Sequence, residues 1–286
     1  MTKLNKHNYV TDFADYKNIV IPKDCVGISP DAYESLCIFA DERETITVES
    51  GNPIYKSIGN CLVDTTQNSV VLGCYNSTIP ADGSIKTIDH HAFSGICGME
   101  SENPRRFTYI KIPQSVEQIK HHAFSDSGLT YIDLPQGLKE IGNMAFMLTS
   151  LGSDNQRITV PNTVTNFGIG VFAGCKSLKR LRFSENEIYK SESDCIYNKQ
   201  TKTLLAVHCG AFAEILPCEA NIIAPLTFMG QNKKAEYYIP ENYTEIKVSP
   251  LGLPKIIEFP VTIVAKQGSY AHRFAIEQGI DYKEWK

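Results

Sequence analysis

Apolar residues recur at fixed distances from a series of prolines along the chain. The stretch from Ile112 to Phe146 reads IPQSVEQIKHHAFSDSGLTYIDLPQGLKEIGNMAF and repeats one phrase, I-x-I-P-x-x-V-x-x-I-x-x-x-A-F, around Pro113 and Pro135. Looser copies, one with two inserted residues and one truncated, surround Pro22, Pro80, Pro161, Pro217, Pro240 and Pro260. Where copies follow directly, their prolines are 22, 26 or 23 residues apart, a period typical of solenoids built from stacked repeats.

The repeated phrase has a simple physical meaning. Two apolar residues flank one polar residue before the proline, which indicates a short strand with alternate side chains in the core. Such a strand cannot bury its apolar face alone, but stacked copies form a parallel sheet with rungs about 4.8 Å apart. Proline ends the strand because it has no N–H, and the Ala-Phe pair then fills the space between two layers. The pattern predicts an α/β repeat solenoid with short parallel strands, with Phe124, Phe146 and Phe172 buried.

A second, longer repeat is superimposed on the first. NPIYKSIGNCLVDTTQNSVVLGC begins at Asn52, and NEIYKSESDCIYNKQTKTLLAVH begins at Asn186, at an offset of 134 residues without a gap. Each stretch alternates apolar and polar residues on both sides of a polar tip, at Asp64–Asn68 and at Asn198–Lys202. Two β-rich runs around a short polar loop predict a β-hairpin. We therefore expect hairpin insertions near 52–75 and 186–209.

The two ends of the chain differ from the repeats. Residues 1–16 are polar with scattered aromatic residues, and we expect them to cap the first rung. Within a C-terminal cap at 261–286, Ser269 is placed to begin a short helix and Gly279 to end it. Its apolar stripe consists of Tyr270, Ala271, Phe274 and Ala275. No Gly- or Ser-rich linker interrupts residues 17–286, so we expect a single solenoid there.

The phrases LPQGLKEIGNMAF, IPQSVEQIKHHAF and VPNTVTNFGIGVFAGCKSLKRL resemble the BspA-like leucine-rich repeats. The resemblance extends from about Ile19 to Tyr282, and it departs from the family phrase where Thr227 and Pro250 replace the alanine. It implies a leucine-rich-repeat horseshoe or superhelix, irregular near those two residues. It also implies cell-surface adhesion or protein binding, which some members perform, and it supplies no set of catalytic residues.

Composition and charge exclude several classes of function. Apolar residues make up 42% and charged residues 21% of the chain, as in a folded protein. The formal net charge of −4 does not favour nucleic acid or an anionic membrane. No apolar run approaches the roughly 18 residues of a membrane span, and the N-terminal residues do not read as a secretory signal. We therefore expect neither nucleic-acid binding nor membrane insertion.

The nine cysteines form no C-x-x-C pair and no zinc-finger spacing. Free thiols favour the cytoplasm, whereas the family resemblance leaves a cell-surface or secreted location open. Cys61 and Cys195 occupy equivalent hairpin positions, and Cys175 stands where the family phrase has a small apolar residue, so we expect packing and not nucleophilic chemistry. The sequence contains no phosphate-binding loop, dinucleotide glycine pattern or G-x-S-x-G motif, and we expect no cofactor and no enzymatic activity.

Two histidine pairs are the best candidate metal ligands. His90-His91 and His121-His122 both precede Ala-Phe in neighbouring copies, so stacking brings several imidazoles close together. No acidic residue or cysteine recurs beside them in register. An exposed turn without metal is therefore the favoured interpretation, with metal binding left open.

The strand positions that face away from the core form a candidate binding face. These positions lie two and four residues before each proline, or at the equivalent places in a rung that has no proline. They carry tyrosine and charged residues. They are Tyr109, Lys111, Tyr131, Asp133, Arg157, Arg180, Arg182 and Tyr238. Tyrosine and arginine are enriched at the centres of protein interfaces. The alternative is an ordinary solvated sheet face, on which the arginines pair with Asp133 or other neighbours.

The sequence thus favours a non-enzymatic leucine-rich-repeat module that binds another protein on its sheet face. A local run of arginines on a slightly acidic chain favours an acidic partner. A glycan-binding or adhesive surface protein is the alternative, because tyrosines can stack on sugar rings.

Overall fold

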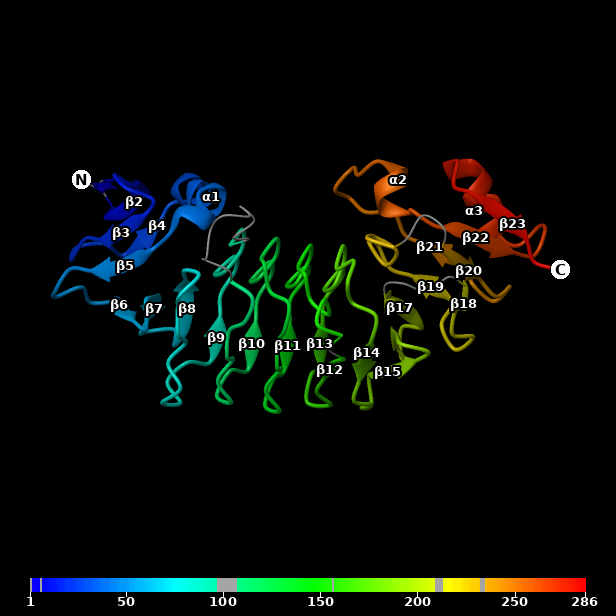
Figure 1. Ribbon diagram of the computed structural model, residues 1–286, viewed down its shortest axis with the longest axis horizontal. Coiled ribbons are helices and arrows are strands. Elements are labelled where there is room, and N and C mark those ends of the chain that lie inside the picture. Colours follow the sequence, from blue (N-terminus) through cyan, green and yellow to red (C-terminus); the bar gives the residue numbers. More distant parts are fainter. Residues whose placement is uncertain (1, 6, 97–106, 156, 209–212, 232–234) are drawn as a thin grey trace.

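The computed structural model describes residues 2–5, 7–96, 107–155, 157–208, 213–231 and 235–286. The protein is an elongated arch of stacked β-rungs with its two termini at opposite ends (Figure 1). Helices are few and short: α1 (Pro30–Ile38), the 3-10 helix η1 (Ala40–Glu42), α2 (Lys255–Glu258) and α3 (Tyr270–Gln278). The repeat solenoid expected from the sequence is confirmed, with much more strand than helix in the described residues.

One layer of the arch consists of two ladders of very short strands. The first contains β6 (Tyr55–Ile58), β7 (Cys61–Asp64), β8 (Ser69–Leu72), β9 (Thr87–Ile88), β10 (Gln118–Ile119), β11 (Glu140–Ile141) and β13 (Asn166–Phe167). The second contains β15 (Tyr189–Glu192), β16 (Cys195–Asn198), β17 (Thr203–Ala206), β19 (Ile222–Ile223) and β21 (Glu245–Ile246). From β8 and from β17 onward the pairing is parallel, and Ile119 lies between Ile88 and Ile141 in register.

The opposite layer contains further short strands, three of which lie just before a proline of the repeat. They are β12 (Ile158–Val160) with β14 (Leu181–Phe183), and β18 (Ala213–Ile215) with β20 (Glu236–Tyr238), β22 (Thr262–Ala265) and β23 (Tyr282–Glu284). At the N-terminal end, β3 (Asn18–Ile21) pairs with β5 (Thr45–Val48), while β1 (Lys3–Leu4), β2 (Tyr9–Asp12) and β4 (Gly27–Ile28) form a separate sheet.

The longest parallel ladder is formed by the segments that follow the prolines. The sequence pattern predicted it in the segments that precede them. Chain length explains the difference. Six residues separate the proline from the paired apolar residue in most copies, so these segments stack in register. The return segment varies, with three residues from Leu129 to Ile132 and seven from Leu151 to Ile158. Around the return segment at residues 107–112 the ladder is incomplete, because the Thr108 carbonyl accepts from both Thr130 N and Tyr131 N.

A row of stacked phenylalanines fills the space between the layers. The rings of Phe93, Phe124, Phe146 and Phe172 follow one another with centroids 5.2, 5.4 and 5.6 Å apart. Their planes are within 5–11° of parallel, and each ring is at most 6% exposed. The expected burial of Phe124, Phe146 and Phe172 is confirmed.

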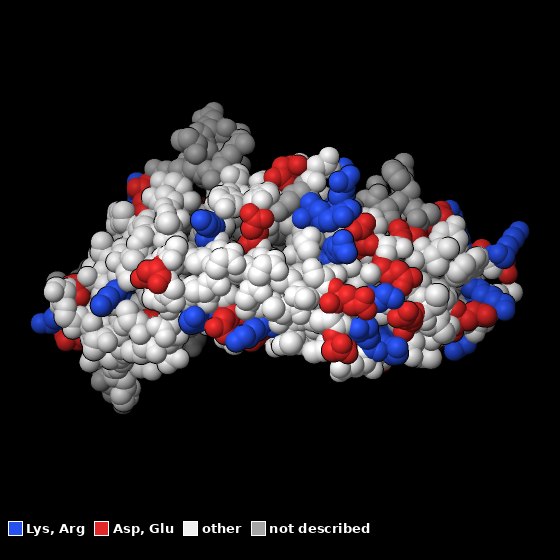
Figure 2. Space-filling view, turned by 90° about the horizontal axis from the view of Figure 1, so that it is seen from below, with Lys and Arg blue, Asp and Glu red and all other residues white. Residues whose placement is uncertain are grey.

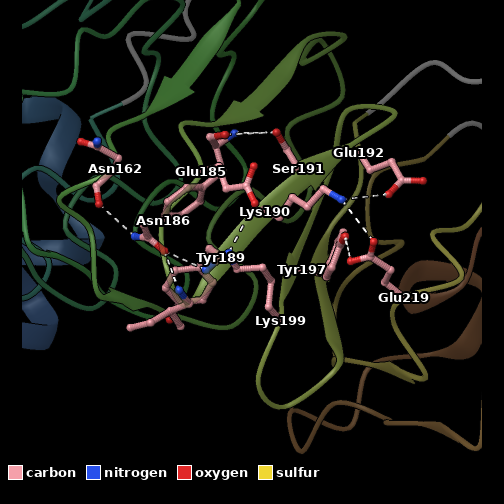
Figure 3. A network of polar contacts seen from close by, with 12 residues as sticks. Asn162, Glu185, Asn186, Tyr189, Lys190, Ser191, Glu192, Tyr197, Lys199 and Glu219 are labelled. Atoms are coloured by element: carbon pink, nitrogen blue, oxygen red, sulfur yellow. Dashed lines mark hydrogen bonds and ion pairs between the residues drawn. The ribbon is translucent and has the colours of Figure 1, made fainter.

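The two predicted hairpins are present, and each carries one additional preceding strand, β6 or β15. Their tips use the same hydrogen bonds, since the Asp64 and Asn198 side chains each accept from the backbone N–H groups two and three residues later. Asn52 and Asn186 anchor the hairpins. The Asn186 amide donates to Asn162 O and Val164 O and accepts from Ile188 N and Tyr189 N (Figure 3).

The hairpins also separate the interior into three cores. In β7, Leu62 packs in the N-terminal core and Val63 in the central core. In β16, Ile196 packs in the central core and Tyr197 in the C-terminal core. Successive strand residues point to opposite faces, so each hairpin is buried on both sides and joins two cores.

The C-terminal cap forms as expected. Ser269 accepts from His272 N at the start of α3, and Gly279 ends the helix in the left-handed conformation at φ +66°. The two departures from the family phrase have different outcomes. Thr227 stays buried and donates to Ala224 O, whereas Pro250 is exposed where the rung gives way to the segment leading into α2.

Candidate functional site

The candidate face alternates as the sequence predicted. Ile110 and Ile112 are buried, whereas Tyr109, before the first isoleucine, and Lys111, between the two, are exposed. The same alternation holds at residues 131–134, 157–160 and 180–183, so Asp133, Arg157, Arg180 and Arg182 are also exposed. The inward neighbours fill the core, so these outward side chains are not part of it.

Two tyrosines occupy the end of this face nearest the N-terminus. The rings of Tyr109 and Tyr131 are 5.5 Å apart, and Tyr109 is 49% exposed. The Tyr131 hydroxyl donates to both carboxylate oxygens of Asp133 at 2.8 Å. This hydrogen bond raises the pKa of Tyr131 and fixes the orientation of its ring. The pair presents two adjoining aromatic surfaces, and the Asp133 carboxylate beside them already accepts a hydrogen bond from Tyr131.

Three arginines occupy the next two rungs. In the β12–β14 pair, Thr159 lies opposite Arg182, and Ile158 N donates to Arg180 O, which places Arg157 beside Arg180. Within the part of the chain that the structure describes, no carboxylate lies within ion-pair distance of these guanidinium groups. Asp133 forms no ion pair with these arginines within the described residues, and its carboxylate accepts from Tyr131.

Many lysines elsewhere are paired across neighbouring rungs. Lys190 lies between Glu192 and Glu219 at 3.9 and 3.2 Å, and Tyr197 donates to Glu219 at 2.7 Å (Figure 3). Those bonds raise the pKa of Lys190 and lower the pKa of Glu219. Seen from below, Lys and Arg side chains gather on one rim near the middle of the long axis, while both charges alternate toward one end (Figure 2). Unpaired arginines therefore distinguish the candidate face from the hairpin surface.

Tyr238 does not belong to this cluster. It lies in β20, in the sheet at the C-terminal end of the arch (Figure 1), where its ring meets Trp285 edge-on at 5.4 Å. A cleft of about 340 Å³ beside it is lined by Pro240, Glu241, Lys266, Trp285 and Lys286. The sequence interpretation missed Trp285, although it is the single tryptophan of the chain.

Comparison with known proteins identifies the repeat. The BspA type leucine rich repeat region, with six copies, matches residues 65–155, 102–215 and 156–262. The chain belongs to the BspA-type leucine-rich repeat family. As a BspA-type repeat protein it is built from stacked leucine-rich repeats. Among curated proteins, none matches the sequence.

Several solved structures are similar to the BspA-type array. A leucine-rich repeat protein from Eubacterium ventriosum is 16% identical with a TM-score of 0.47, over 91% of this chain and 66% of that one. A leucine rich cell surface protein from Faecalibacterium prausnitzii is 15% identical with a TM-score of 0.47, over 92% and 74%. The pneumococcal vaccine antigen PcpA is 15% identical with a TM-score of 0.44, and the match covers 94% of this chain but only 56% of PcpA.

The histidine pairs of the BspA-type rungs form one cluster. His91 stacks on His122 at 4.9 Å, and His121 lies 4.1 Å from His122 and 5.9 Å from His91. Within the described residues, no three His, Cys, Asp or Glu side chains are placed to hold a metal ion. Burial lowers the pKa of His91 and His121, and lowers that of His122 to about 4. Burial therefore disfavours the charged form of these three imidazoles.

The cysteines of the described BspA-type rungs are free, as expected. Cys61, Cys175 and Cys195 are fully buried, and burial raises the pKa of the Cys61 and Cys175 thiols to about 11. Cys175 contacts the Thr149 hydroxyl and donates to Phe146 O. These thiols pack and are not activated nucleophiles. Cys97 and Cys209 lie outside the described residues. No helix in the described part of the chain is both long and apolar enough to span a membrane.

Proposed function

We propose that the chain is a non-enzymatic module that binds an acidic protein partner on the face formed by Tyr109, Tyr131, Arg157, Arg180 and Arg182. One observation carries the proposal. Arg157 and Arg180 lie beside each other just before the paired strands β12 and β14, and Arg182 lies in β14. All three are exposed, and none forms an ion pair within the described residues. Unpaired like charges repel one another, so a patch of this kind is stabilised when carboxylates from a partner reach it.

The tyrosine pair adds contact area to the charged patch. Tyrosine combines a large rigid surface with a hydrogen-bonding hydroxyl at low entropic cost. Tyr109 and Tyr131 lie one rung apart, and their rings already touch, so little side-chain freedom remains to be lost on binding. The sequence contains no catalytic motif, and burial raises the pKa of the Cys61 and Cys175 thiols, which supports a binding role.

Affinity capture from the source cell tests this proposal. The unaltered chain is compared with the double variant Arg180→Glu/Arg182→Glu and with the matched control Lys23→Glu/Lys56→Glu, which changes the charge equally at exposed lysines in the N-terminal part. We expect the partner to be lost with the arginine variant and retained with the control. Retention by both, in variants that fold, contradicts the proposal and directs attention to the hairpin tips at Asp64–Asn68 and Asn198–Lys202.

A glycan-binding role is favoured by a different observation. Tyr238 and Trp285 lie edge-on beside the cleft at the C-terminal end, where Glu241 and Lys266 form an exposed ion pair at 3.1 Å. An indole face and polar groups together suit a sugar ring. A glycan microarray probed with the unaltered chain and with Trp285→Ala separates the two functions, because the arginine variant should leave glycan binding at this cleft unchanged.

A further inference from the structure

Four extra residues interrupt the regular repeat next to the arginines. The spacing of 26 residues between Pro135 and Pro161 exceeds the preceding spacing of 22. The excess falls between Leu151 and Ile158, in a turn at residues 152–155 that projects beside the following rung. Insertions of this kind are tolerated in a solenoid because they leave the stacked segments unchanged, and they often form part of a binding surface.

The inserted turn and the next rung enclose a cleft of about 540 Å³. Its lining consists of Gly152, Ser153, Asp154, Asn155, Lys176, Ser177 and Lys179. We name it the basic cleft. Gly152 holds the turn against the rung, since its φ is +87° and a Cβ there would come within 2.8 Å of Ser177 O. The Ser153 hydroxyl donates to Ser150 O, and Asn155 N donates to Gly152 O, so the wall formed by the turn has a defined shape.

Positive charge surrounds the basic cleft. Lys176 and Lys179 line the cleft, and Arg157 and Arg180 come directly before β12 and β14, the two strands that lead away from it. All four side chains are exposed and form no ion pair within the described residues. The lining also contains one carboxylate, that of Asp154, against the two lysines. The site is therefore cationic in a protein with a net charge of −4.

The spacing of the charges fits an extended peptide. Arg182 lies in β14, and Arg180 comes directly before that strand. Both side chains are exposed while Leu181 between them is buried, and alternate residues of an extended chain are about 6.5–7 Å apart. Alternate residues of an extended peptide have the same spacing. A segment with acidic residues at every second position can thus place one carboxylate at each arginine, with bidentate hydrogen bonds. It can then continue past Lys179 into the basic cleft.

We propose that the basic cleft binds a carboxylate of an extended acidic peptide segment, whose preceding acidic residues lie on Arg180 and Arg182. The inference rests on the proposed function, for which it specifies the chemistry of the docking segment. Lys176 and Lys179 supply the charge, and the inserted turn supplies the wall that limits the ligand to a single chain in extended form.

Fluorescence anisotropy with synthetic peptides tests the inference directly. The probe is a fluorescein-labelled peptide of four Glu-Ser repeats, and its control is the same peptide with Gln in place of Glu. Three double variants are compared with the unaltered chain: Lys176→Gln/Lys179→Gln, Arg180→Gln/Arg182→Gln, and the distant control Lys23→Gln/Lys56→Gln. Far-UV circular dichroism confirms that each variant folds, as expected for exposed side chains.

We expect the Glu peptide to bind more tightly than the Gln peptide. The cleft variant should weaken binding at least about tenfold, since two desolvated charge contacts are lost, and the distant control should change it less than about twofold. Weakening by the arginine variant alone overturns the inference about the cleft and leaves the proposed function standing. If the captured partner still binds both the cleft variant and the arginine variant, the inference about the cleft and the proposed function are both overturned. Binding of a sulfated oligosaccharide in place of the Glu peptide overturns the peptide assignment in favour of an anionic glycan.

Discussion

Replacing Phe124 with alanine should destabilise the protein by about 4–5 kcal/mol, the upper part of the range for a buried phenylalanine. The structure gives two reasons. The side chain is 0% exposed, so its whole apolar surface enters the transfer and cavity terms. It also stacks on both faces, with Phe93 at 5.2 Å and Phe146 at 5.4 Å, and each ring pair contributes about 0.5–1.5 kcal/mol beyond burial. Phe172 has one stacked neighbour in the row and should lie lower, near about 3 kcal/mol.

Urea unfolding followed by far-UV circular dichroism measures these values, with Tyr109→Ala as the exposed aromatic control, for which we expect a change within about 0.5 kcal/mol. A double-mutant cycle with Phe124→Ala and Phe146→Ala isolates the stacking contribution. Because the two rings touch, we expect a coupling energy of about 0.5–1.5 kcal/mol. A loss below about 1 kcal/mol for Phe124→Ala, well under the range for a buried ring, or additivity of the two substitutions, refutes the account of the core.

Three further expectations concern pH, cooperativity and thiols. Burial lowers the pKa of His122 from 6.5 to about 4, so the unfolded chain binds more protons than the folded chain between those pH values. Stability therefore falls as the pH is lowered through this window, by about 1 kcal/mol for this partly buried ring. His122→Asn, which keeps the left-handed backbone at φ +55°, should reduce that slope in urea titrations at pH 7 and 4.5. Fluorescence of the single Trp285 should report the same urea midpoint as circular dichroism, because the hairpins join the cores; separated midpoints contradict a single cooperative solenoid. Iodoacetamide without reductant, followed by peptide mapping, should label exposed Cys218 first and the buried cysteines only after unfolding; disulfide-linked peptides contradict the assignment of free thiols.

The periodic features of the fold could be predicted from the sequence because each depends on local spacing. The hairpins follow from alternation around a polar tip, and α3 follows from Ser269 and Gly279 around an apolar stripe. The outward direction of Tyr109 and of the arginines follows from strand alternation alone. These properties require no knowledge of which distant segment lies beside the strand.

Other features depend on contacts between distant parts and escaped prediction. Ala32 and Tyr33 match the Ala-Phe position of the Pro22 copy, yet they lie in α1, which begins at the Ser29 cap. Tyr33 there donates to Val71 O and His90 O, so the helix is held by rungs far along the chain. The basic cleft likewise needs a four-residue insertion to meet the next rung. The longer spacing between Pro135 and Pro161 shows in the sequence that residues are inserted there. The sequence does not show in which direction the inserted turn projects.

The central rungs have the same kind of neighbour on both sides. Gln118 pairs with Thr87 on one side and with Glu140 on the other, and Phe124 stacks between two phenylalanines. Removing one full copy, residues 114–135, would place Thr87 beside Glu140 and Phe93 beside Phe146, which are again a polar pair and a phenylalanine pair. Both hairpins would remain in place. The number of central rungs therefore sets the distance between α1 and α2, which rise from the same edge of the arch on the two sides of these rungs (Figure 1). That distance changes in steps of about 4.8 Å, so gain or loss of a rung adjusts the reach of the molecule without altering either end.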